Sequence, residues 1–153
     1  MADTREGKGN IFLKILIVIL SVVLIYIIVT PWQQKVAADR LKLNSRERMD
    51  YIRSGLLYYI GKTGTYAPSL QELVNDLKND PVAIAKQDSI FKIRPGKVVY
   101  LDSLLVSPVT KSAFIYQLND SSAVKKYLLK CPGGSGWIGS LSFDDSTNKA
   151  SWE

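Results

Sequence analysis

An almost uninterrupted apolar run near the N-terminus constrains this chain more than any other feature. Residues 11–30 read IFLKILIVILSVVLIYIIVT, with Lys14 as the one charged residue among them. Wound as a helix, a run of this length crosses a hydrocarbon layer of about 30 Å. A surface helix of a soluble protein would carry a polar face, and this run has none. We therefore expect a transmembrane helix over residues 11–30, preceded by a short tail of residues 1–10.

A cleaved secretory signal is the alternative interpretation of the same run. The apolar core of a signal peptide spans roughly 7–15 residues and ends at a cleavage site made of small residues. Here the run is longer, and Pro31, Trp32, Gln33 and Gln34 follow it. Trp32 after the run and Tyr26 within it suit a position at the membrane interface. The pattern favours a retained anchor in contact with membrane lipid. Basic residues flank the run about equally on its two sides, so charge alone does not decide the orientation.

The composition of the rest of the chain argues against several classes of site. The 153 residues allow one small domain besides the anchor. The net charge is +6, but no basic run exceeds a pair, so nucleic-acid binding is not indicated. The sequence has no histidine and a single cysteine, Cys131, which excludes an internal disulfide and a cysteine-based zinc site. We expect no enzyme activity and no cofactor; a tethered enzyme is a weaker alternative for which no catalytic residue can be named.

An amphipathic helical extension is predicted for residues 31–64. Along it, mostly apolar residues recur at steps of three or four, which is the helical spacing. This stripe comprises Ala38, Leu41, Ser45, Met49, Ile52, Leu56 and Tyr59. We expect the stripe to pack on a small α+β domain formed by residues 65–153. A basic line runs beside the stripe and comprises Lys35, Lys42, Arg46 and Arg53. This basic line is either a solvated flank or a contact strip for anionic lipid headgroups or an acidic neighbouring subunit.

The signals for the next elements are local. Gly61 and Gly64 predict the end of the long helix. Ser69 and Glu72 form a capping box, which predicts a second helix over residues 70–78. That helix would bury Leu70, Leu73, Val74 and Leu77, and the sequence Asn79-Asp80-Pro81 would end it. Residues 81–91 are compatible with a short helix or an irregular connection.

The apolar period then changes to that of strands. We expect strands over residues 97–101, 113–118, 124–131, 137–143 and 150–152, with the second and third forming an antiparallel hairpin. The predicted fold class is α+β, in which a transmembrane helix continues into a long amphipathic helix that packs on a small antiparallel sheet.

Four stretches together carry a family resemblance. Gly9 directly precedes Asn10 and the apolar run, and Pro31 follows that run. Residues 58–74 read YYIGKTGTYAPSLQELV, and residues 107–116 read SPVTKSAFIY. This order resembles type IV pilins and type II secretion pseudopilins, in which a Gly marks the prepilin-peptidase site and a Pro lies near the end of the apolar half of the first helix. In the middle stretch, Ala67 interrupts the usual Tyr-Pro pair of the family.

The resemblance implies a non-enzymatic structural subunit of a secretion or surface-filament system. Such a subunit is anchored once in the inner membrane, with its domain in the periplasm or outside the cell, and its partners are other pilin-like or membrane-complex subunits. The alternative function is a single-pass accessory or binding subunit of an unrelated membrane complex.

Two positions depart from the family pattern. Asn10 stands where the family has a hydrophobic first mature residue, and Lys14 stands where it has a Glu at the fifth mature position. The resemblance implies that this Glu pairs with the N-terminal amine of a neighbouring subunit. We therefore expect residues 1–9 to be retained. Lys14 either extends to the cytoplasmic headgroups or meets an acidic group of another subunit.

Three further features have two interpretations each. Asp144 and Asp145 lie in a polar stretch that is either a β-turn or, by the resemblance to major pseudopilins, a Ca²⁺ site. Cys131 is either a buried small apolar side chain or, in an oxidising compartment, half of an intermolecular disulfide. A set of aromatic residues either packs in the core or stacks on a ligand, and it comprises Tyr58, Tyr59, Tyr66, Trp137 and Trp152.

Overall fold

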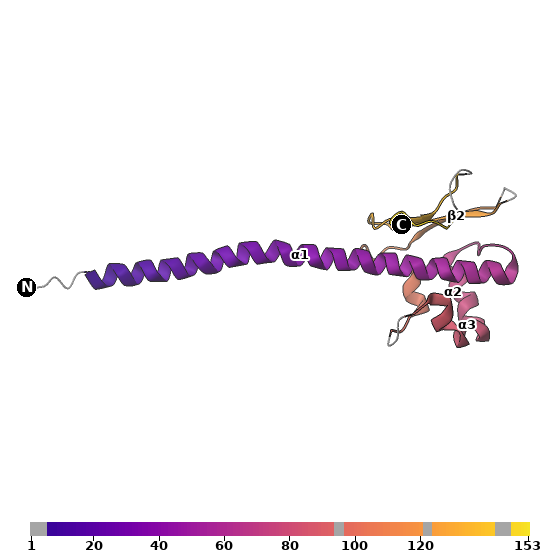
Figure 1. Cartoon of the computed structure of the whole chain (residues 1–153), viewed down its shortest axis with the longest axis horizontal. Coiled ribbons are helices and arrows are strands. Elements are labelled where there is room, and N and C mark those ends of the chain that lie inside the picture. The colour runs from indigo at the N-terminus through magenta and orange to yellow at the C-terminus, as the bar shows by residue number, and fades with distance from the viewer. Residues whose placement is uncertain (1–5, 94–96, 121–123, 143–147) are drawn as a thin grey trace, which may run out of the picture. The chain divides into compact units, whose positions relative to one another are not determined.

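The computed structural model describes residues 6–93, 97–120, 124–142 and 148–153, and for residues 6–10 it describes the backbone alone. The chain has the expected α+β class, with one long helix, shorter helices and a three-stranded antiparallel sheet (Figure 1). It divides into two compact units, Met1–Arg40 and Leu41–Glu153.

Helix α1 (Glu6–Thr63) contains both the apolar run and the amphipathic extension, and Pro31 lies inside it. The helix ends at Gly64, which has a φ of 76° and donates its N–H to the Ile60 carbonyl oxygen at 2.8 Å. A left-handed residue at this position is a common helix terminator, so the prediction for Gly64 is confirmed. The prediction for Gly61 is wrong, because Gly61 lies within the last helical turns.

The stripe on α1 is buried only in its C-terminal part. Ser45, Met49, Ile52 and Leu56 are buried, and Tyr59 is half-buried against the core. Ala38 and Leu41 are exposed, so their predicted burial is wrong. A helical period shows which face of a helix is apolar, but it does not show where along the helix the packing partner begins.

Helix α2 (Leu70–Asn79) matches its prediction closely. The Ser69 side chain accepts a hydrogen bond from the Glu72 N–H at 3.2 Å, which satisfies one of the free donors at the helix start. Its buried residues are the four expected ones, Leu70, Leu73, Val74 and Leu77. Two short helices follow, α3 (Pro81–Ala85) and α4 (Gln87–Phe91), so residues 81–91 are mostly helical.

The sheet has the order β1-β2-β3, with strands β1 (Ile115–Asn119), β2 (Lys126–Lys130) and β3 (Trp137–Gly139). Strand β1 pairs antiparallel with β2, in a register that places Gln117 opposite Leu128, so the predicted hairpin is confirmed. Strand β3 is shorter than the predicted fourth strand, whose residue 143 lies outside the described residues. The predicted terminal strand is reduced to a single bridge between Ile138 and Ala150.

The first predicted strand, over residues 97–101, is wrong. Residues 97–100 form no regular element, and the 3₁₀ helix η1 (Leu101–Leu105) begins at the next residue. The strand-forming residues Val98, Val99 and Tyr100 are present, but no neighbouring strand in the described part of the chain pairs with them. Strand propensity describes how a side chain fits a paired, half-buried surface, and that surface is missing here.

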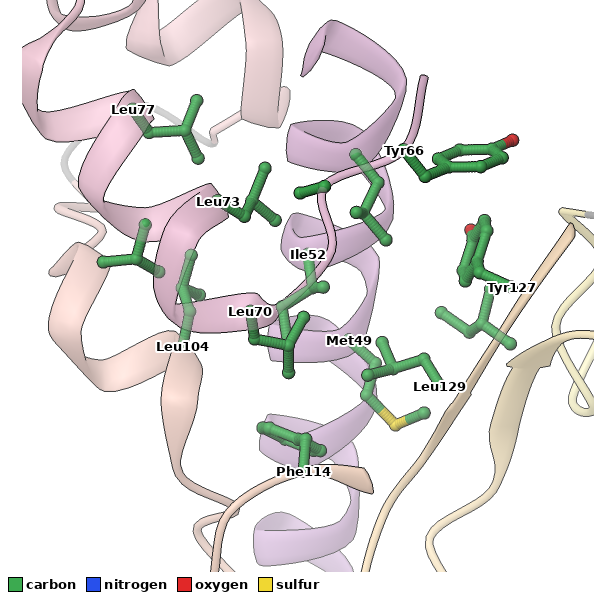
Figure 2. Close-up of a cluster of buried hydrophobic side chains, with 14 of the residues drawn as sticks. Met49, Ile52, Tyr66, Leu70, Leu73, Leu77, Leu104, Phe114, Tyr127 and Leu129 are labelled. Atoms are coloured by element: carbon green, nitrogen blue, oxygen red, sulfur yellow. The ribbon is translucent and has the colours of Figure 1, made fainter. Parts of the chain in front are cut away.

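The core forms within the Leu41–Glu153 unit, on both sides of α1. Figure 2 shows Leu70 and Leu73 of α2 on one side of Met49 and Ile52, and Tyr127 and Leu129 of β2 on the other. Each of the labelled α1 residues is almost fully buried. The C-terminal turns of α1 thus serve as the central layer of the unit, between the helices and the sheet.

Candidate functional site

The first candidate site is the apolar surface of α1 around residues 11–29. Every apolar side chain from Ile11 to Val29 exposes at least 40% of its surface, on all sides of the helix. The helix is long and apolar enough to cross a membrane. An apolar surface this continuous is unfavourable in water, whereas contact with hydrocarbon satisfies it.

The hydroxyl groups near this surface find partners within the helix. Ser21 donates its hydroxyl hydrogen to the Ile17 carbonyl oxygen at 2.8 Å, and Thr30 donates to the Tyr26 carbonyl oxygen at 2.7 Å. Bonds to the carbonyl four residues back remove the need for water. The polar atoms of these two hydroxyls are therefore compatible with a hydrocarbon environment.

The predicted membrane residues have different environments. Lys14 is exposed on α1, as is Trp32. Pro31 lies inside the helix, where its missing N–H leaves one carbonyl without its usual donor. The membrane and assembly roles of these three residues stay predictions.

The basic line separates into two exposed and two structural residues. Lys35 and Lys42 are exposed. Arg46 donates from Nε to the Ser135 carbonyl oxygen at 2.9 Å, and its guanidinium lies 5.2 Å from the centroid of the Trp152 ring. The interpretation as a solvated flank is therefore wrong for Arg46, which fastens the C-terminal segment to α1. A contact with lipid or another subunit stays a prediction for the line as a whole.

Arg53 has a similar structural role. Its guanidinium lies 2.8 Å from a carboxylate oxygen of Glu153 and 3.0 Å from one of Asp50, and it also donates to the Asn148 carbonyl oxygen at 3.1 Å. The hydrogen bond from Arg53 lowers the pKa of Glu153. Burial raises the pKa of Asp50, against the attraction of Arg53. Arg53 therefore also falls outside the solvated-flank interpretation.

The Asp80 carboxylate is the centre of a hydrogen-bonded cluster that the sequence analysis did not predict. The side chain of Asp80 accepts hydrogen bonds from Lys62 Nζ at 3.0 Å, from the Tyr58 hydroxyl at 3.0 Å and from the Val82 N–H at 2.9 Å. The bond from Lys62 is the main cause that lowers the pKa of Asp80 to about 2, opposed by partial burial. The cluster joins the end of α1 to the junction of α2 and α3. The signal that could have found it is an Asp directly before a Pro at the first helical position.

Cys131 and most of the aromatic set lie in the core. Cys131 is buried, and its Sγ lies 3.2 Å from the Ser107 hydroxyl oxygen, which agrees with the small-apolar interpretation. Tyr66 is buried, and its ring forms a T-shaped pair with the Tyr127 ring at a centroid distance of 4.9 Å. Trp137 is exposed, so the core interpretation is wrong for that residue. The remaining members pack partly buried against the core: Tyr58, Tyr59 and Trp152.

Candidate ligand positions are few in the described part of the chain. Asp144 and Asp145 lie outside the described residues. Among the residues from 11 onward that the structure describes, no three His, Cys, Asp or Glu side chains gather as a metal site would require. An open groove of about 610 Å³ lies beside β3 and is lined in part by Lys130, Trp137 and Lys149.

Comparisons of this chain with protein-family models, with curated proteins and with solved structures gave no match.

Proposed function

We propose that this protein is a non-enzymatic, single-pass membrane subunit of the pilin or pseudopilin kind. The observation that carries the proposal is the continuity of α1. One helix contains an apolar surface exposed on all sides at residues 11–29 and a buried stripe from Ser45 to Leu56. A chain of this design combines a helix held by lipid with a folded α+β unit. Element order and the sequence resemblance support the pilin-like part of the proposal.

Membrane insertion is the first point to test. The full chain should stay in the membrane fraction after extraction at alkaline pH, which removes peripheral proteins. A variant with Leu20→Glu and Leu24→Glu should be extracted, because two carboxylates in the middle of the apolar run oppose insertion. A matched control, Leu43→Glu with Leu57→Glu, alters two exposed leucines beyond the run and should remain in the membrane. Release of the unaltered chain would remove the anchor from the proposal.

Orientation and processing form the second test. A reporter fused after Glu153 should give a periplasmic signal, and a cytoplasmic signal would exclude the pilin-like assignment. Because Asn10 and Lys14 depart from the family pattern, intact mass should show that residues 1–9 are retained. Cleavage after Gly9 would contradict the processing prediction and strengthen the family assignment.

Lys14 offers a test of assembly. In the proposed subunit, Lys14 pairs with an acidic group on a neighbouring subunit at the same depth, since an ionic group near hydrocarbon is stabilised by an opposite charge. Lys14→Glu should then reduce co-purification of partners while membrane insertion persists, and Lys14→Arg should preserve both. If Lys14→Glu leaves every partner bound, Lys14 only reaches toward headgroups.

A second candidate function is an accessory subunit of an unrelated membrane complex. The departures at Asn10 and Lys14 favour it, because they stand where pilins carry their processing and assembly residues. Co-purification separates the two proposals: partners with the Gly-led apolar N-terminus of prepilins favour the first, and partners without it favour the second.

A further inference from the structure

Two extended backbone edges lack a pairing partner among the described residues of the Leu41–Glu153 unit, and the first is the outer edge of β1. On the opposite edge strand, β3, the Gly139 N–H donates to the Lys149 carbonyl oxygen, and the Trp137 carbonyl oxygen accepts from the Ser151 N–H. In an antiparallel sheet, successive residues bond to alternate sides. Following that alternation through β3 and β2 shows that the backbone N–H and C=O groups of Tyr116 and Leu118 are directed away from β2, toward the outer edge of β1. Their N–H and C=O groups have no hydrogen-bond partner among the described residues.

A small apolar pocket lies beside this edge. Its volume is about 300 Å³, and its walls include Leu105, Ala113, Phe114 and Tyr116. Phe114 is buried, whereas Ala113 is exposed at the mouth. The edge thus offers backbone donors and acceptors together with a place for an apolar side chain. These are the two features by which a sheet edge binds an added strand.

The second unpaired edge is the segment 97–100. Val98 and Tyr100 are 69% and 73% exposed, whereas Val99 between them is buried. This alternation is that of a half-buried strand. The Val99 carbonyl oxygen accepts a hydrogen bond from Gln87 Nε2 at 3.0 Å, which occupies the inner edge of the segment. On the opposite edge, the Tyr100 carbonyl oxygen accepts from the Ser103 N–H at 2.9 Å, whereas the N–H and C=O of Val98 and the N–H of Tyr100 have no hydrogen-bond partner in the described part of the chain. Three backbone groups of this edge are therefore open.

We propose that segment 97–100 of one copy of this chain adds to the β1 edge of a second copy. The open N–H and C=O groups of Tyr116 and Leu118 on one copy are complementary to the Val98 N–H and C=O and the Tyr100 N–H on another, because main-chain hydrogen bonds join a sheet edge to an added extended segment. In the joined state, Val98 and Tyr100 face the apolar pocket beside β1. The contact joins two different surfaces, so each copy keeps one free donor segment and one free acceptor edge, and assembly can continue from copy to copy.

This inference does not depend on the proposed membrane function, because it concerns only the Leu41–Glu153 unit. It also accounts for the strand-like pattern of residues 97–100, which pairs with no strand in the part of the chain that the structure describes. A long, exposed apolar edge is a hazard for indiscriminate aggregation, whereas both edges here are short.

The test blocks each half of the contact separately in the full chain, in detergent micelles. The donor variant carries Val98→Lys and Tyr100→Lys. The acceptor variant carries Ala113→Arg, which places a charged side chain in the pocket from an exposed position. The matched controls are Val82→Lys with Ile84→Lys, two exposed residues of α3, and Ser112→Arg beside the pocket. Sedimentation velocity gives the number of copies per particle, and circular dichroism gives a check on folding.

The unaltered chain and both controls should associate with rising concentration, and each blocked variant should lose that association. An equal mixture of the two blocked variants should form a particle of two copies, because the free edge of the donor variant accepts the intact segment of the acceptor variant. Persistence of association in both blocked variants, or failure of the folded mixture to pair, overturns the proposal. If the donor pair Val98→Lys with Tyr100→Lys unfolds the chain, Val98→Ser with Tyr100→Ser replaces it, because serine removes the apolar side chains without adding charge.

Discussion

The Tyr58 hydroxyl donates a hydrogen bond to the Asp80 carboxylate at 3.0 Å, across the boundary between α1 and the α2–α3 junction. The same carboxylate also accepts from Lys62 and from the first N–H groups of α3. The Asp80 side chain therefore caps the start of α3 and ties it to the end of α1, while the Asp80 N–H closes α2 on the Asp76 carbonyl oxygen at 2.9 Å.

We predict an acid-sensitive contribution of Asp80 to stability. Its pKa in the folded chain is about 2, below the value of about 3.9 expected in an unfolded chain. A lowered pKa means that the carboxylate stabilises the fold fully above about pH 4 and that this contribution is lost as the pH falls toward 2. Denaturant melts of the unaltered chain and of Asp80→Asn should differ clearly at pH 7 and converge at low pH. An equal difference at all pH values would contradict the charged role.

Adjacent leucines on α1 give a matched test of the core. Leu56 is fully buried, whereas Leu57 exposes 44% of its surface. Leu56→Ala should lower the free energy of unfolding by about 2–5 kcal/mol, because it leaves a cavity between α2 and the sheet. Leu57→Ala should cost less than about 1 kcal/mol. Comparable losses for the two variants in denaturant melts would show that the buried face of α1 is misassigned.

Two glycines near the end of α1 should respond oppositely to alanine. Gly61 lies in the helix, and apart from its neighbours and the nearby backbone of the helix itself, no atom lies within 4 Å of a Cβ placed there. Gly61→Ala should therefore raise the free energy of unfolding by up to about 1 kcal/mol, through helix propensity. Gly64 has a φ of +76°, where a Cβ is strained, so Gly64→Ala should lower the stability by about 1 kcal/mol. Thermal melts of both variants check the signs, and a gain at Gly64 would show that its helix cap is not left-handed.

Removing the hydroxyl group from each of two core tyrosines should have different effects on stability, because only one of the two hydroxyls is hydrogen-bonded within the described part of the chain. The Tyr116 hydroxyl donates to the Ala67 carbonyl oxygen at 2.8 Å, so Tyr116→Phe should cost about 0.5–1.5 kcal/mol. The Tyr127 hydroxyl is buried and has no hydrogen-bond partner among the described residues. Tyr127→Phe should therefore leave the stability unchanged or raise it, because it removes an unsatisfied polar group. A loss at Tyr127 equal to that at Tyr116 would indicate a bonded hydroxyl.

Local signals in the sequence predicted the elements whose ends depend on neighbouring residues. The bond from the Glu72 N–H to Ser69 starts α2 where the capping box indicated. The turn composition between β1 and β2 predicted their antiparallel pairing. Each signal acts over a few residues, so its effect on the local structure does not depend on the rest of the fold.

The roles of charged residues were not accessible in the same way. Arg46 and Arg53 share one line of α1 with Lys35 and Lys42, but their partners lie 89 and up to 100 residues further along the chain. The spacing along a helix shows that such residues share a side, and it cannot show what packs there. The role of Asp80 could not be predicted for a related reason, because Tyr58 and Lys62 contact its carboxylate only after α2 folds back on α1.

The sequence by itself determined the apolar helix, because its side chains are apolar in every direction and no arrangement of the remaining residues is needed to show it. It also determined the second helix and the hairpin, through local capping and turn chemistry. Only the tertiary structure decided that the buried stripe of α1 begins at Ser45 and that residues 97–100 pair with no strand among the described residues. Both outcomes depend on contacts between residues far apart in sequence, and burial and strand pairing are properties of two surfaces that meet, which one surface alone does not specify.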